Sequence, residues 1–175
     1  MSRKTLALSK KRFIIAAVLM IIITAAAVLI SFMSTPYLVM YVSDTSTRYI
    51  TQKAEDGLMF SVEFIHSVNQ TPVKDTYIIE NEQIRAYSTT YRSFGAGVQT
   101  ALDDGQTMTY DDDGNMVITG FDITYNPLRY IVGTVSDHIL TIDDKEISLR
   151  DLCGRNAKVV FEITTPFEIL TKGLL

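Results

Sequence analysis

The chain has 175 residues, 47% of them hydrophobic, and 16 Lys and Arg side chains stand against 20 Asp and Glu side chains. Acidic surface is poorly suited to binding phosphates, so the charge balance argues against a nucleic-acid partner. The only cysteine, Cys153, can form no internal disulfide and lies too far from the N-terminus to be a lipidated first residue. Its expected role is a small buried apolar side chain.

Residues 1–12 form a basic tail, and residues 13–32 form an apolar run in which only Thr24 and Ser31 are polar. Twenty helical residues span about 30 Å, the thickness of the hydrocarbon core of a bilayer. The tail holds five basic residues and no acid. Because short basic flanks stay in the cytoplasm, we expect a single-pass anchor in the cell membrane with residues 36–175 outside.

A cleaved secretory signal is the alternative for this segment, with Ala25 and Ala27 near a cleavage site. A signal core needs only about 7–15 apolar residues. The run here continues to Phe32, which favours an uncleaved signal anchor. Without the five N-terminal bases, 11 Lys and Arg remain against 20 acids, a formal net charge of −9 on the rest of the chain.

Residues 36–175 are predicted to form one all-β domain, an antiparallel β-sandwich or a barrel-like domain. Val, Ile, Thr, Tyr and Phe are frequent, apolar residues alternate, turn signals recur, and helical periodicity is hard to find. The expected strands cover 37–42, 48–53, 58–68, 73–79, 83–91, 116–125, 139–142, 146–149 and 158–165. A polar loop at 43–47 and turns at 54–57, 80–82, 111–115 and 143–144 connect several of them.

His66 is the first candidate site residue. On a strand over 58–68 it would share the apolar side with Phe60, Val62 and Phe64, while Ser67 points to the other side. An imidazole in such a place must pair its nitrogens or stay neutral. Asp75 on the next strand is a candidate partner, and a core histidine bonded to a carbonyl or hydroxyl is the alternative.

A second candidate is the segment 92–97, Arg-Ser-Phe-Gly-Ala-Gly, because two glycines allow positive φ angles and bring backbone N–H groups close to a ligand. Such a loop can hold an anion, but it can equally be a bulge or a crossover between sheets. It has no third glycine and no helix expected after it, so it does not indicate a nucleotide site.

No metal, cofactor or catalytic residue is predicted, and we expect no enzyme. The only two histidines, His66 and His138, have no ligand at metal-site spacing, and the acidic turn 111–115 lacks the alternating carboxylates of a calcium loop. A hydrolytic enzyme of the cell envelope would need a nucleophile and an oxyanion loop within reach of His66.

Two motifs carry a resemblance to a known family: His66-Ser67-Val68-Asn69-Gln70-Thr71-Pro72-Val73, and then Ser93-Phe94-Gly95-Ala96-Gly97. Over residues 37–102 the chain resembles the bacterial family called domain of unknown function 1850 (DUF1850). The resemblance implies a membrane-anchored protein with no assigned catalytic residues. It also implies association with tripartite ATP-independent periplasmic (TRAP) transporters of the TAXI type.

We therefore expect an accessory subunit whose outer domain contacts a transporter permease or its solute receptor. The candidate contact surface or small-ligand pocket consists of His66, Ser67, Thr71, Pro72, Asp75, Arg92, Ser93, Gly95 and Gly97. A stand-alone small-ligand or sensory module is the alternative. An apolar pocket in which His66 and Arg92 converge would favour that alternative.

Overall fold

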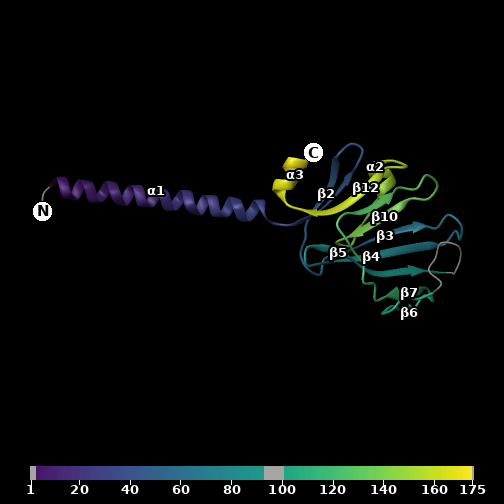
Figure 1. The fold of residues 1–175 in the computed structure, drawn as a ribbon. Coiled ribbons are helices and arrows are strands. Elements are labelled where there is room, and N and C mark those ends of the chain that lie inside the picture. Colours follow the sequence, from purple (N-terminus) through teal and green to yellow (C-terminus); the bar gives the residue numbers. More distant parts are fainter. Residues whose placement is uncertain (1–2, 93–100, 175) are drawn as a thin grey trace.

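The computed structural model describes residues 3–92 and 101–174. A long helix, α1 (Arg3–Met33), projects from one side of a β domain (Figure 1). Its segment Lys11–Met33 is long and apolar enough to cross a membrane, and its apolar side chains are exposed. A continuous apolar surface of this size is typical of a membrane or protein interface.

Two antiparallel sheets form the β domain, and neither closes into a barrel, so the all-β prediction is confirmed in its sandwich-like form. The small sheet has the order β2 (Thr47–Lys53), β1 (Tyr37–Val42), β12 (Lys158–Thr164), β9 (Leu128–Ile131). The large sheet has the order β11 (Lys145–Ser148), β10 (His138–Ile142), β3 (Met59–Ile65), β4 (Pro72–Glu80), β5 (Gln83–Tyr91), β7 (Met116–Thr119), β6 (Thr107–Tyr110), and β8 (Thr124–Tyr125) pairs with β5.

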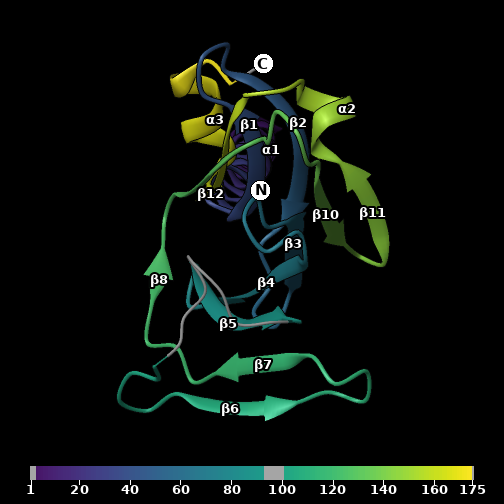
Figure 2. The ribbon, with the colours of Figure 1, turned by 90° about the vertical axis from the view of Figure 1, so that its right-hand side faces the viewer.

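The core lies between the inner faces of the two sheets. Alternating residues of β3, β4 and β10 point toward β1 and β12, as the period of two along a strand requires. At its centre the Phe60 ring stacks on Tyr77 at 5.2 Å and on Phe161 at 5.3 Å. β7 and β6 extend beyond the part of the large sheet that faces the small sheet (Figure 2).

Several expected strands are confirmed, including 37–42 and 83–91, but two have the wrong bounds. The strand expected at 58–68 ends at Ile65, because His66 opens a loop. The strand expected at 116–125 is divided into β7 and β8 at Gly120, which has a φ of 81°. A Cβ at Gly120 would lie 2.3 Å from the backbone oxygen of Gly105, so this close crossing needs glycine.

Strands β6 and β9 and two short helices, α2 (Leu149–Cys153) and α3 (Pro166–Lys172), are not expected from the sequence. Both helices begin at a capping residue. Ser148 Oγ accepts a hydrogen bond from the Asp151 backbone N–H, and Thr165 forms a capping box with Glu168. These caps are the local signal for the helices, since five and seven residues are too few to show a clear periodicity.

Candidate functional site

The outer face of the large sheet, which points away from the small sheet, carries a row of hydroxyl side chains. Ser61 on β3 is opposite Thr76 on β4 and Thr141 on β10, and the row continues onto β5, β7 and β6. In register order the row is Thr141, Ser61, Thr76, Ser88, Thr119 and Thr107. Directly opposite residues share a face, so six strands present hydroxyls side by side.

Two hollows of about 450 and 510 Å³ lie on this face and share Lys74 and Thr76 in their walls. We call the joined hollow the outer groove. The first part is lined by Met59 and Ser61 among others, and the second by Glu63, Pro72 and Arg92. The outer groove therefore collects two of the predicted site residues, Pro72 and Arg92, on strand ends that the β3–β4–β5 pairing brings together.

The outer groove carries charges of both signs. Glu63 lies directly opposite Lys74 on the neighbouring strand, and Arg92 shares the wall of the second hollow with Asp111 and Asp113. Hydrogen bonds from Asn115 lower the pKa of Asp111, and the Arg92 charge lowers it further. A surface that carries charges of both signs suits orientation-dependent contact with a complementary partner.

The His66-to-Thr71 segment forms the loop between β3 and β4, with the His66 backbone N–H donating to the Thr71 oxygen at 2.9 Å. Its ring organises this loop, because Nδ1 accepts from the backbone N–H groups of Val68 at 3.3 Å and Asn69 at 3.4 Å. His66 thus does not lie on the apolar face of a strand, and that prediction is wrong. Ser67 and Val68 are exposed in the same loop.

Asp75 is separated from both His66 and the outer groove. It pairs with Val62 across β3, four residues before His66, which corresponds to about 13 Å along the strand. Its side chain points to the inner face. Among the other predicted site residues, Ser93, Gly95 and Gly97 lie outside the described residues.

Asp75 instead forms a polar network inside the domain. Its Oδ1 accepts from Thr89 Oγ1 at 2.9 Å and its Oδ2 accepts from the Tyr130 hydroxyl at 3.1 Å, while the Tyr130 and Tyr77 hydroxyls lie 2.5 Å apart. Tyr130 comes from β9, so the network joins the two sheets. Sequence reasoning missed Tyr130, because only the tertiary fold brings β9 against β4.

Burial raises the pKa of the Asp75 carboxyl, although the bonds from Thr89 and Tyr130 oppose the shift. The folded chain then binds this proton more tightly than the unfolded chain. Stability from Asp75 is thus present below the ordinary aspartate pKa of about 3.9 and is lost as the pH rises through the raised pKa. We expect Asp75→Asn to remove this loss, so that the variant's stability relative to the native chain improves with pH across that window.

Urea unfolding at a series of pH values measures this difference, with exposed Asp122→Asn as the control for loss of one acid. The hydrogen bond from the Thr165 backbone N–H is the main cause that lowers the pKa of Glu168. Glu168 therefore makes the free energy of unfolding rise with pH, opposite to Asp75, and only the comparison between variants isolates the effect of Asp75. A pH-independent difference between Asp75→Asn and the native chain would contradict the prediction.

Among the described residues, no group of three His, Cys, Asp or Glu side chains is placed to hold a metal ion. Cys153 is half-buried, and burial raises the pKa of its thiol to about 11. A thiol that stays protonated at neutral pH is a poor nucleophile. His138 is buried, stacks on Phe64 at 4.9 Å and accepts from the Gly133 backbone N–H, which is a packing role.

Comparison with known proteins adds one finding. A family model described as Domain of unknown function (DUF1850) matches residues 60–149, just over half of the chain. No curated protein and no solved structure matches the chain. The resemblance drawn from the sequence covers residues 37–102, and the matched range overlaps it over 60–102. The matched range continues to residue 149, so the match includes most of the large sheet and most of the outer groove.

Proposed function

Because this chain belongs to the family described as Domain of unknown function (DUF1850), we propose that it is a membrane-anchored accessory subunit whose β domain binds a protein partner through the outer groove. The observation that carries the proposal is the outer groove itself, where the β3–β4–β5 pairing joins two hollows at Lys74 and Thr76. All of its lining residues except Gly57, Leu58 and Met59 lie within the matched range, and the proposal assigns the outer groove no catalytic role.

The shape and the charge of the outer groove support a protein contact over a small-ligand pocket. A small-molecule site is usually concave and mostly apolar, with a few convergent polar groups. The second hollow of the outer groove is mainly polar, and the first has polar and apolar side chains in its wall in similar measure. His66 is not in the wall that contains Arg92. The convergence of His66 and Arg92 that would favour a stand-alone ligand-binding or sensory module is therefore missing from the described hollows.

The resemblance gives the finer form of the proposal. The partner is the permease or the solute receptor of a TAXI-type TRAP transporter, in a bacterial cell envelope. In this arrangement α1 crosses the membrane once with its basic end in the cytoplasm, and the acidic β domain stands outside, where it meets the partner.

Charge reversal at the edge of the outer groove tests the proposal. The tagged full-length protein is purified from membranes in mild detergent, and co-purifying proteins are identified by mass spectrometry. We expect Arg92→Glu to lose the partner, because reversing this charge removes the charge complementarity between the outer groove and the partner. Each 1.4 kcal/mol of lost binding free energy lowers the affinity about tenfold.

Arg155→Glu is the matched control, since Arg155 is also exposed but is absent from the wall of the outer groove. It should retain the partner at the native level. Recovery of the native protein alone, or equal loss in both variants, would count against the outer groove as the contact surface.

A further inference from the structure

Helix α3 packs on the small sheet through one side only. Ile169, together with Leu174 just after the helix, is buried against Val39 of β1, and Tyr37 and Tyr41 pack around them. The capping box at Thr165 fixes the start of the helix, and Gly173 in the left-handed conformation ends it. The buried side chains and the two caps therefore fix the orientation of α3 on the small sheet.

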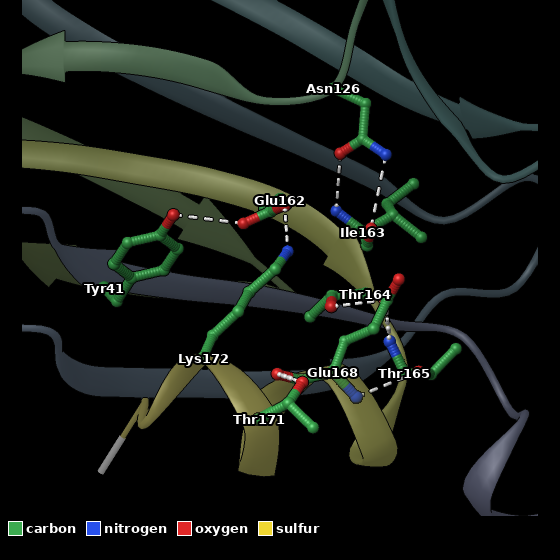
Figure 3. A network of polar contacts seen from close by, with 9 residues as sticks. All are labelled: Tyr41, Asn126, Glu162, Ile163, Thr164, Thr165, Glu168, Thr171 and Lys172. Carbon is green, nitrogen blue, oxygen red and sulfur yellow. Dashed lines mark hydrogen bonds and ion pairs between the residues drawn. The ribbon is translucent and has the colours of Figure 1, made fainter.

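The polar side chains of α3 are held by the domain (Figure 3). Lys172 Nζ lies 2.6 Å from Glu162 Oε1 on β12, and Tyr41 donates to the other oxygen of Glu162. Glu168 Oε2 accepts from Thr164 Oγ1 at 2.7 Å and from the Thr165 backbone N–H at 3.0 Å. These bonds turn the charged side of α3 toward β12.

Two large apolar side chains remain on the free side of α3. Phe167 is 62% exposed and Leu170 is 70% exposed. Residues three apart in a helix are neighbours on one side, so these two form one small apolar ridge. Adjacent exposed apolar side chains such as these are a candidate contact surface.

The position of α3 indicates what this surface contacts. α3 contacts α1, and Figure 1 places it beside the end of α1 that enters the β domain. Twenty residues from Phe13 to Phe32 account for the 30 Å of a hydrocarbon core, so this end of α1 lies at the membrane surface. α3 then lies at the same level, where headgroups meet acyl chains.

We propose that α3 is a lipid-contacting helix, with Phe167 and Leu170 inserted into the interfacial layer of the bilayer that α1 crosses. Aromatic side chains favour this layer, and helices with one apolar side lie in it. Together with α1 this contact gives the domain a second attachment to the membrane, which fixes how the outer groove is presented. The inference rests on the membrane anchoring in the proposed function.

The chain contains no tryptophan, so one substitution creates a unique fluorescent probe. We compare Phe167→Trp with Tyr110→Trp, because Tyr110 is 64% exposed but lies on β6, far from α1 (Figure 1). The full-length variants are reconstituted in phosphatidylcholine vesicles with or without bromine on the acyl chains. We expect the Phe167→Trp emission to lie at shorter wavelength and to be strongly quenched by brominated lipid, and the Tyr110→Trp emission to show neither effect.

The outcomes separate this inference from the anchoring on which it rests. A chain that is extracted from the vesicles by alkaline carbonate overturns both. If the chain is retained but Phe167→Trp behaves like Tyr110→Trp, the anchoring stands and the lipid contact is wrong. A short-wavelength emission without quenching by brominated lipid also overturns the lipid contact, since protein then covers position 167.

Discussion

Replacing Phe161 by Ala is expected to lower the free energy of unfolding of the β domain by about 3–5 kcal/mol. Phe161 is 1% exposed on β12 of the small sheet, and its ring stacks on Phe60 of the large sheet and meets the Tyr130 ring edge-on at 6.3 Å. Removing the ring leaves a cavity between the two sheets. Urea unfolding of the full-length protein in mild detergent, followed by circular dichroism, measures the loss.

Phe167→Ala is the matched control, because it makes the same substitution at a side chain that the domain leaves exposed. It should change the free energy of unfolding by no more than about 0.5 kcal/mol in detergent. Equal effects of the two substitutions would contradict the packing of the small sheet on the large sheet through Phe161.

The second large effect is expected in α1. Replacing Ile22 and Ile23 by Arg places two charges at the middle of the apolar segment. Each Arg at the centre of a membrane helix costs about 2.5–3.5 kcal/mol of insertion free energy, so the pair costs about 5–7 kcal/mol. This cost is comparable to the total favourable insertion free energy of the apolar side chains of α1. We therefore expect the variant chain to leave the membrane fraction.

Replacing the same two residues by Leu keeps the segment apolar and should leave the protein resistant to alkaline carbonate extraction. Fractionation of cells that express each variant, with detection of a C-terminal tag, gives the measurement. Full membrane retention of the Arg variant would show that α1 is not what holds the protein there.

Much of the fold could be predicted because strands carry local signals. The alternation in 83–91 and the turn that follows 73–79 predict β4 and β5 well. Helix α3 was missed because its signals are a capping box and Pro166 at its start, which a search for periodicity passes over. The strand predicted over 58–68 extends too far, because His66 continues the alternation of the strand in the sequence. In the structure its ring instead accepts hydrogen bonds from the loop that follows β3.

The outer groove was only partly predictable. The first family motif points to Pro72, and the candidate glycine segment 92–97 begins at Arg92; both residues line the outer groove. Ser61 and Thr76 show no local signal, since their alignment depends on the register between neighbouring strands. That register includes a bulge at Thr76 and Tyr77 in the pairing of β4 with β5, and the sequence does not reveal it.

Site-specific photo-crosslinking in intact membranes tests the central claim most directly. A photoreactive amino acid replaces Thr76, in the wall shared by the two hollows, or Thr51, an exposed residue on β2 of the small sheet. The account predicts a covalent adduct with one membrane or receptor protein from position 76 and none from position 51. Adducts from position 51 alone, or from neither position, would contradict a partner in the outer groove.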